Sequence, residues 1–468
     1  MLRSNALLGS LMALAILAAT PLTAPAGDVN IERASRMLSE YIQVDTSVPP
    51  ILPREPAPGY IDLLTENYVY PTGLTAEVID GRIFLIRWIP DEPDGRAPVM
   101  FLGHGDVVPV ADDELDQWVH PPFDGVIADG YVWGRGAIDN KGSSIALLEA
   151  ITMLHKKGIR PQREIQLLIG PDEEIGGTHG TLQYIQQDME RFGVPAFVID
   201  EGAFIVPDMV EGRNMTAIAV GEKGYLSIRV TTEAEAGHAS MPYGESAPDI
   251  LTRAMLKLNE FQFPVTMLPP MEGLLDAMGD ELGGFSGFML RNRWLSGPLV
   301  RRELESKAAS NAMIRNTLVL TMINTGIKDN VIPAHAEAIY NVRLLPGQDK
   351  EEALATLRKV VDDNRVRIET HEYWGDTPMS PMEGEAWEAF RTAMERTVPD
   401  SFLSPAISPA TTDSRHFAQA GIPAYKMVPF IMDAEDRQRI HGRNERLSLA
   451  NLEQAIRFYE VMLEELIR

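Results

Sequence analysis

Short apolar runs alternate with stretches of helical spacing over the first half of the chain. Runs of this kind, without polar alternation, are typical of strands that are buried on both faces of a sheet. Their alternation with helices predicts an α/β sheet that is covered on both sides. The predicted strands are residues 83–89, 99–102, 165–169 and 196–199, and the predicted helices are residues 31–44, 143–155 (expected to be amphipathic) and 178–189.

The pattern changes near Gly221, where the alternation of a half-buried strand replaces continuous apolar runs. The segments that follow have the order β-α-β-β-α-β, which is that of a small ferredoxin-like domain. After Gly375, helices and strands alternate again. We therefore predict a mixed-sheet α/β main domain, residues 27–221 and 376–468, with a smaller domain inserted at 222–375. The segments of the smaller domain are residues 225–231, 248–261, 317–323, 336–343, 350–363 and 366–373, interrupted by an unassigned stretch at 263–310.

The N-terminus has the features of a secretory signal peptide. Arg3 precedes an apolar run at residues 6–19, and an Ala24-x-Ala26 ending follows. We expect residues 1–26 to be removed, which predicts an exported protein, periplasmic or extracellular. An uncleaved anchor is the alternative, but the run is shorter than the roughly 20 residues that a membrane span needs. The rest of the sequence offers no run of that length, so no stable span is expected in the mature chain.

Composition narrows the chemistry that is available to the chain. The 468 residues include no cysteine, which excludes disulfides and a thiolate nucleophile. Any metal must therefore be held by His, Asp or Glu. The net charge of −25 repels nucleic acid and anionic membrane surfaces, so neither is expected as a partner.

Chemically active residues follow two of the predicted strands. His104 and Asp106 come after the run at 99–102, and a spacing of two on an extended chain puts both side chains on one face. Glu173 and Glu174 come after the run at 165–169. One of two adjacent carboxylates can bind a metal while its neighbour deprotonates a water molecule. Taken singly, each motif also fits a structural role, as a strand end or an acidic solvent loop.

Three further motifs repeat the same theme. Asp200 and Glu201 end the run at 196–199, and His441 lies in a polar loop before the last helix. Asp139 lies in a glycine-flanked turn before the helix at 143–155, where by itself it would be interpreted as the cap of that helix. Among the remaining histidines, His416 is the main rival as a metal ligand.

Strand ends in an open α/β sheet meet at one edge, where ligands bind. We therefore expect these His, Asp and Glu residues to gather at a single metal site. The charges are consistent with two zinc ions. Their positive charges balance one hydroxide and the carboxylates of Asp139, Glu174 and Glu201.

These motifs together resemble the dizinc metallopeptidases, the family of aminoacylase, acetylornithine deacetylase and carboxypeptidase S. Within it, the chain is most similar to carboxypeptidase S and the secreted N-fatty-acyl-amino-acid synthase/hydrolases. The resemblance implies a zinc-peptidase-like catalytic domain with an inserted ferredoxin-like lid and dimerisation domain, so a homodimer is expected. The segments that carry it are residues 103–109, 134–142, 171–177, 200–202, 237–240, 330–333, 412–415 and 439–445.

By motif, the resemblance implies two zinc sites that Co²⁺ or Mn²⁺ can also fill. Asp139 is then the ligand that bridges both ions. His104 and Glu201 complete one site, and Glu174 and His441 complete the other.

The resemblance also implies that Glu173 is the general base and that Asp106 supports His104 from its outer side. One assignment stays open. Asp200 and Glu201 are adjacent, with side chains on opposite faces, so only one of them can be the ligand. Register with aminoacylase favours Glu201.

Residues outside the metal motifs are expected to bind the substrate. His238 resembles a histidine that reaches across a dimer to the scissile carbonyl oxygen, and Asn330 resembles its oxyanion partner. Arg343 resembles the arginine that holds the substrate carboxylate. Asp413 and Arg415 are expected to line the substrate pocket.

The predicted function is hydrolysis of an amide bond next to a free carboxylate, in N-acyl amino acids or short peptides. Aminoacylase-like and carboxypeptidase- or dipeptidase-like activities both fit, and the same site could run in reverse as an N-fatty-acyl-amino-acid synthase. An inactive, receptor-like ectodomain is the non-enzymatic alternative, which the complete ligand set disfavours. The stretch at 263–310 predicts either an apolar channel for a long acyl chain or helices packed on the main body or on a dimer partner.

Overall fold

The computed structural model describes residues 29–48 and 59–468. The predicted signal peptide and residues 49–58 lie outside the described residues. Within them, no helix is long and apolar enough to cross a membrane.

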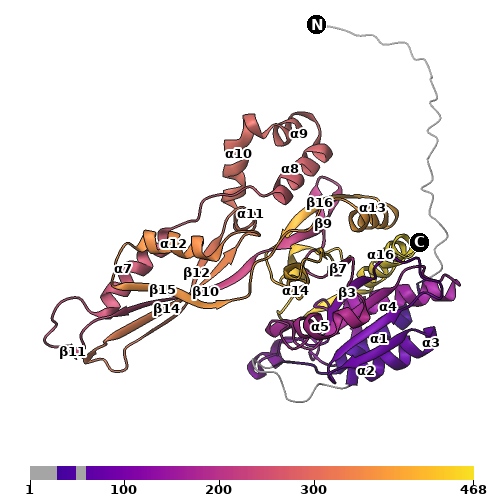
Figure 1. The fold of residues 1–468 in the computed structure, drawn as a ribbon, viewed down its shortest axis with the longest axis horizontal. Helices are drawn as coiled ribbons and strands as arrows, with labels where there is room; N and C mark the ends of the chain where they lie inside the picture. Colours follow the sequence, from indigo (N-terminus) through magenta and orange to yellow (C-terminus); the bar gives the residue numbers. More distant parts are fainter. Residues whose placement is uncertain (1–28, 49–58) are drawn as a thin grey trace, which may run out of the picture.

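A large mixed sheet forms the body of the molecule (Figure 1). Its strand order is β1-β2-β6-β3-β7-β17-β9-β16, and β8 pairs with β9. The central strands β6, β3, β7 and β17 run parallel, whereas β1 and β2 are antiparallel additions at one edge. The α/β prediction is therefore confirmed. The strands are β1 (Thr75–Ile79), β2 (Ile83–Trp88), β3 (Val99–His104), β6 (Ile165–Gly170), β7 (Phe197–Asp200), β8 (Ile205–Val210), β9 (Arg213–Glu222), β16 (Ser401–Ser408) and β17 (Ala424–Lys426).

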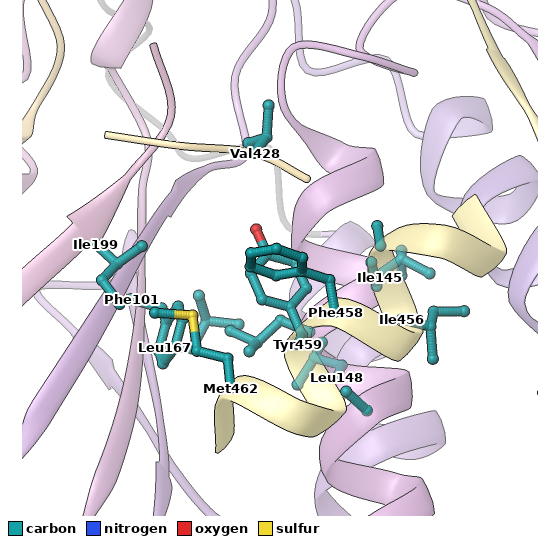
Figure 2. Packing of buried hydrophobic residues seen from close by; sticks show 14 of the residues in the cluster. Phe101, Ile145, Leu148, Leu167, Ile199, Val428, Ile456, Phe458, Tyr459 and Met462 are labelled. Atoms are coloured by element: carbon teal, nitrogen blue, oxygen red, sulfur yellow. The ribbon is translucent and has the colours of Figure 1, made fainter. Parts of the chain in front are cut away.

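Helices cover both faces of this sheet because successive strand residues point to opposite sides. On one face, Phe101 and Ile199 pack against Tyr459 and Met462 of α16, as Figure 2 shows. On the other face, Met100 and its neighbours pack against helices that follow β6 and β16. The first face is covered by α1 (Ile31–Gln43), α4 (Lys141–Lys156), α13 (Glu385–Thr397) and α16 (Leu449–Leu466), and the second by α5 (Thr181–Gln187), α6 (Met189–Phe192) and α14 (Ser414–Gln419).

Helix α4 differs from its prediction as an amphipathic helix. It is buried on almost all sides, from Lys141 to Thr152, because it lies between the sheet, α1 and α16. The predicted helix at 178–189 is also shorter than expected: α5 ends at Gln187, and a separate short helix, α6, follows.

The inserted domain is a four-stranded antiparallel sheet with two helices. Its strand order β12-β14-β10-β15 and chain order β-α-β-β-α-β confirm the ferredoxin-like prediction. The domain has a core of its own around Ile228 and Tyr340. Its elements are β10 (Gly224–Glu233), α7 (Ala247–Glu260), β12 (Thr317–Thr325), β14 (His335–Leu344), α12 (Lys350–Val361) and β15 (Val366–Tyr373).

The unassigned stretch at 263–310 is helical. Leu274 and Met278 of its first helix pack on the apolar face of β8, β9 and β16, and Gly273 lies close to Pro405. This contact favours packing on the main body over an acyl channel. The helices are α8 (Pro269–Leu282), α9 (Gly284–Arg291), α10 (Arg293–Ser306) and α11 (Ala308–Met313).

Small elements complete the fold. The chain passes from the large sheet to the small one at Lys223 and returns after Tyr373, while the predicted domain limits stay predictions. The strands β4 (Ile127–Ala128), β5 (Tyr131–Trp133) and β18 (Arg446–Ser448) form a separate sheet. The remaining elements are α2 (Gly59–Leu64), α3 (Tyr70–Thr72), α15 (Ala434–Arg437) and the paired strands β11 (Gly237–His238) and β13 (Val331–Ile332).

Candidate metal centre

Three parallel strands end side by side and bring the predicted motifs together. His104 is the last residue of β3 and is paired in register with Gly170, the last residue of β6. Glu173 and Glu174 follow β6, while Glu201 follows β7 on the other side of β3. The ends of these strands therefore form one edge, as the sequence predicted.

Asp139 lies between two histidines that are far apart in the sequence. Its Oδ1 is 3.0 Å from His104 Nε2, and its Oδ2 is 3.0 Å from His441 Nε2. Asn140, not Asp139, is the N-cap residue of α4, and its side chain makes no capping hydrogen bond. Asp139 therefore faces a different histidine with each carboxylate oxygen, as a bridging carboxylate would. It is not the cap of α4.

Each histidine also faces a second carboxylate. His104 Nε2 is 3.3 Å from Glu201 Oε1, and His441 Nε2 is 3.1 Å from Glu174 Oε2. The five predicted ligands thus form two groups that share Asp139. This is the arrangement expected for two ions held by a common carboxylate.

The choice between Asp200 and Glu201 follows from their hydrogen bonds. Both carboxylate oxygens of Asp200 accept backbone N–H groups, from Glu201 at 2.9 Å and from Ser414 at 2.8 Å. Asp200 is buried, whereas Glu201 points to His104. The geometry therefore favours Glu201 as the ligand.

Asp106 contacts both His104 and the turn of Glu173 and Glu174. Its backbone carbonyl oxygen lies 2.9 Å from His104 Nδ1, closer than its carboxylate at 3.6 Å. The carboxylate oxygens instead accept the backbone N–H groups of Glu173 (3.2 Å) and Glu174 (3.1 Å). Asp106 therefore orients the ring mainly through its main chain and fixes the acidic turn with its side chain.

Glu173 lies beside the ligands without a partner of its own. One of its carboxylate oxygens is within 4.8 Å of ligand atoms of His104 and Glu201. Over residues 29–48 and 59–468, no protein group donates a hydrogen bond to this carboxylate. Burial raises its pKa well above the ordinary value, and the neighbouring carboxylates add to the effect. A carboxylate in this position is suited to exchanging protons with a bound water molecule.

The residue set fits divalent metal ions. Burial raises the pKa of Glu201 to about 8 and raises that of Glu174, because carboxylates crowd a site with little solvent. Among the described residues, only histidines pair with these ligand carboxylates, and Glu174 Oε1 is buried with no hydrogen-bond partner. Imidazole nitrogens and carboxylate oxygens without thiolates are a donor set that zinc accepts.

A buried ion pair, not assigned from the sequence, holds the loop of Asp139 and the loop of His441 together. Arg135 Nη1 donates to Glu445 Oε2 at 2.8 Å, and Nη2 donates to the carbonyl oxygen of His441 at 3.2 Å. Glu445 Oε1 accepts the N–H groups of Ile138 (2.9 Å) and Asp139 (3.3 Å). Both residues lie within motifs that signalled the family, but their pairing over such a long sequence distance left no local signal.

The residues predicted to line the substrate pocket have partners inside the protein. Asp413 Oδ2 accepts a hydrogen bond from Thr181 at 2.7 Å, and burial raises the pKa of Asp413 to about 7. Arg415 donates to the carbonyl oxygen of Gly176, in the turn that follows Glu174. Both side chains are 2% exposed. These contacts position the acidic turn, and direct binding of substrate by either residue stays a prediction.

His416 is not brought to the metal ligands. Its Nε2 lies 3.2 Å from the carbonyl oxygen of Gly176, and burial lowers its pKa to about 4. It supports the same turn as Arg415. His416 is therefore excluded as a rival ligand in this structure.

Arg343 lies half-buried at the junction of the two sheets. Its Nη1 donates to Thr411 Oγ1 at 3.0 Å and its Nε donates to Asn341 Oδ1 at 3.1 Å. Burial lowers its pKa, but an arginine side chain stays protonated in proteins. Its predicted role as the carboxylate-binding group stays a prediction.

His238 and Asn330 are not brought to the metal centre within one chain. They lie at the paired strands β11 and β13, where both side chains are exposed. Figure 1 shows β11 at the tip of the inserted domain, away from the sheet edge where β3 and β7 end. Their predicted role therefore depends on a second copy of the chain or on a different domain arrangement.

Comparison with known proteins places these observations in a family. The model of peptidase family M20/M25/M40 matches residues 100–465. The probable carboxypeptidase S-like 2 of Dictyostelium discoideum is 35% identical over 367 residues, which cover 77% of this chain and 70% of that protein. The human N-fatty-acyl-amino acid synthase/hydrolase PM20D1 is 33% identical over 406 residues, which cover 85% of this chain and 80% of that protein.

Solved structures share the fold at lower identity. The metallo-carboxypeptidase Sso-CP2 from Sulfolobus solfataricus superposes with a TM-score of 0.67 at 20% identity, covering 92% of this chain and 98% of that one. Human carnosine dipeptidase 1 gives a TM-score of 0.63 at 15% identity, covering 93% and 96%. These two similarities support the combination of a large mixed sheet with a separate small one.

Proposed function

The chain belongs to peptidase family M20/M25/M40, and we propose that it is a dizinc enzyme that hydrolyses the amide bond of N-acyl amino acids. Membership makes it a metal-dependent hydrolase, while the two ions and the substrate are the proposal. The observation that carries it is Asp139, with one carboxylate oxygen toward His104 and the other toward His441. Such a carboxylate serves two ions at once.

In this proposal each ion has its own pair of terminal ligands. His104 and Glu201 hold one, Glu174 and His441 hold the other, and Asp139 joins them. Zinc at these positions would lower the pKa of a water molecule and polarise the scissile carbonyl group.

The remaining steps belong to side chains of the protein. Glu173 accepts a proton from the attacking water and later gives it to the leaving nitrogen. Arg343 binds the carboxylate of the amino-acid part of the substrate through the N–H groups at the edge of its planar guanidinium group. His238 and Asn330, contributed by a second copy of the chain, donate hydrogen bonds to the oxyanion as it forms.

The relatives support a substrate with a free carboxylate. One is a carboxypeptidase S-like protein and another an N-fatty-acyl-amino acid synthase/hydrolase, and both names describe an amide bond next to an amino acid. A carboxypeptidase or dipeptidase is therefore the second candidate, and synthesis by reversal of the same site is a third. The signal-peptide pattern supports an exported enzyme. Measuring the zinc content of protein recovered from the exported fraction would test the export and the two metal ions together.

The test is one variant and one panel of substrates. Glu173→Ala is expected to lower kcat by roughly 10²–10⁴-fold, the usual contribution of a general base, while zinc stays near two ions per chain. Zinc is measured by elemental analysis, and Glu40→Ala, at a partly exposed glutamate on α1, is the matched control. Retained activity in Glu173→Ala would refute the role of the base.

Substrate class is decided by rate. N-acetyl, N-lauroyl and glycyl derivatives of one amino acid are compared by kcat/KM with the wild-type enzyme. Preference for the acyl derivatives supports the proposal, and preference for the glycyl dipeptide supports the second candidate.

A further inference from the structure

Four side chains form a continuous stack where the two domains join. The guanidinium carbon of Arg343 lies 4.8 Å from the centre of the Tyr225 ring. Tyr225 and Trp374 stack with ring centres 4.2 Å apart and planes inclined by 17°. At Trp374, the guanidinium carbon of Arg415 lies 4.8 Å from the ring centre. Cations over aromatic faces and offset aromatic stacking are both attractive, so the order Arg343–Tyr225–Trp374–Arg415 is favourable at every layer.

The stack crosses from the inserted domain to the large domain. Arg343 is on β14 and Tyr225 opposes it directly on β10, while Trp374 follows β15 and Arg415 is on α14. Figure 1 shows that β10 passes from the small sheet toward α14 at this junction.

Both ends of the stack are fastened to loops that carry site residues. Arg415 donates to the carbonyl oxygen of Gly176, in the turn of Glu173 and Glu174. Arg343 donates to Thr411 Oγ1, which in turn donates to the carbonyl oxygen of Lys223 at 3.3 Å. The stack therefore links the predicted carboxylate-binding arginine to the turn that carries the proposed base.

The middle of the stack is held by the main chain at the domain crossing. Trp374 N–H donates to the carbonyl oxygen of Tyr225 at 3.2 Å. Gln419, at the end of α14, donates to the carbonyl oxygens of Trp374 (2.9 Å) and Asp376 (3.0 Å). Indole Nε1 donates to Glu372 at 2.8 Å. Trp374 is thus fixed from both domains and sets the separation between the two arginines.

We propose that this stack is a spacer that determines substrate specificity, with Trp374 as its positioning residue. The inference rests on the proposed function. Arg343 holds the substrate carboxylate, and the spacer sets its separation from Glu173, so that the amide one carbon away from the carboxylate reaches the base.

Spacing matters because substrates differ in this dimension by a single bond. In an N-acyl-α-amino acid the nitrogen and the carboxylate share one carbon, whereas an N-acyl-β-amino acid inserts a further methylene, roughly 1.5 Å of bond length. A misplacement of about 1 Å at a reacting centre can cost roughly 10²-fold in rate. A rigid spacer therefore discriminates between these two classes, and a loosened one does not.

The test compares kcat/KM for N-acyl-alanine and N-acyl-β-alanine with the same acyl group. We expect the wild-type enzyme to favour the α-compound, and Trp374→Ala to lower that ratio by at least about tenfold. Trp374→Phe retains an aromatic layer and is expected to restore most of the ratio. Trp294→Ala, at a tryptophan that is 82% exposed on α10, is the matched control and should leave the ratio unchanged.

The outcomes separate this inference from the proposed function. An equal loss for both compounds in Trp374→Ala would mean a merely structural role and would overturn the spacer. If Trp374→Ala does not fold, Tyr225→Leu breaks the adjacent layer and must lower the same ratio. A wild-type enzyme that hydrolyses neither compound, yet cleaves dipeptides, would overturn the proposed substrate class, and the ratio is then measured with alanyl and β-alanyl dipeptides.

Discussion

The metal centre and the β11–β13 strand pair are both predicted parts of one active site, yet the two regions are built differently. His104 is 1% exposed, and its Nε2 lies within 3.3 Å of two carboxylate oxygens from other segments. His238 is exposed, and among the described residues its ring contacts only its own turn, with Ser240 Oγ 2.8 Å from Nδ1. His104 thus has its partners within the chain, whereas the ring of His238 is free to contact another molecule.

The difference teaches where a single chain can build a site by itself. Parallel strands end at one edge, so residues from distant parts of the sequence meet there without any further partner. A pair of short strands at the tip of a domain has no neighbouring strand ends that could supply further site residues. If His238 takes part in catalysis, its site must be completed by another copy or by a change in domain arrangement.

The largest expected effect is at the centre of the buried site. Asp139→Ala removes the carboxylate shared by both groups, so we expect loss of metal and a fall in kcat/KM of roughly 10³-fold or more, since a metal supplies several kcal/mol of transition-state stabilisation. Elemental analysis and steady-state kinetics measure the two effects. Asp113→Ala, on an exposed turn, is the control, and full zinc content in Asp139→Ala would contradict the bridging role.

A smaller effect is expected at the β11–β13 strand pair. His238→Ala should lower kcat by roughly 10²–10³-fold, the cost of one oxyanion donor, without loss of metal or thermal stability. Because the β11–β13 strand pair lies away from the metal centre of its own chain, mixing His238→Ala with Glu173→Ala should restore part of the activity through mixed dimers. His371→Ala, exposed on β15, is the control. No recovery on mixing, together with a dimer in solution, would argue against a site shared between copies.

The smallest expected effect separates the two regions by pH. Burial lowers the pKa of His416 to about 4, below the roughly 6.5 of an unfolded histidine. Below pH 6.5 the unfolded chain therefore binds a proton that the folded protein does not bind until about pH 4. The stability contribution is complete above pH 6.5 and is lost as pH falls through this window, by roughly 3 kcal/mol.

His416→Gln should accordingly flatten the acid dependence of unfolding between pH 6.5 and 4. Urea unfolding of metal-free protein in a chelator measures this pH dependence without a contribution from metal release, and the metal ligands contribute alike to every protein compared. His238→Gln, at the exposed β11–β13 strand pair, is the comparison because it leaves His416 in place. Identical slopes in all three proteins would refute the buried, neutral state of His416.

Much of the fold and the site could be predicted because both depend on local pattern. Apolar runs before His104, Glu173 and Asp200 are buried strands, and the edge where such strands end is set by the parallel topology. The order β-α-β-β-α-β likewise predicted the small domain through periodicity alone. In these cases the residues that specify the element lie within it.

Other features depended on contacts that no short stretch encodes. Helix α4 is buried because α1 and α16 cover the side that a simple amphipathic pattern leaves to solvent. The helices at 263–310 were not recognised because Pro, Gly and Met obscure helical spacing, and α8 is held by the apolar face of β8, β9 and β16.

By itself, the sequence determined which His, Asp and Glu residues follow the buried strands and in which order the elements come, because each follows from the residue and its immediate neighbours. Only the tertiary structure decided which carboxylate oxygen faces which histidine. It likewise decided that the Asp200 carboxylate accepts hydrogen bonds from backbone N–H groups and that Arg135 and Glu445 join two loops. It also decided that Arg343 and Arg415 flank the same aromatic pair. These are matters of distance between segments far apart in the chain, and packing of the whole molecule fixes them.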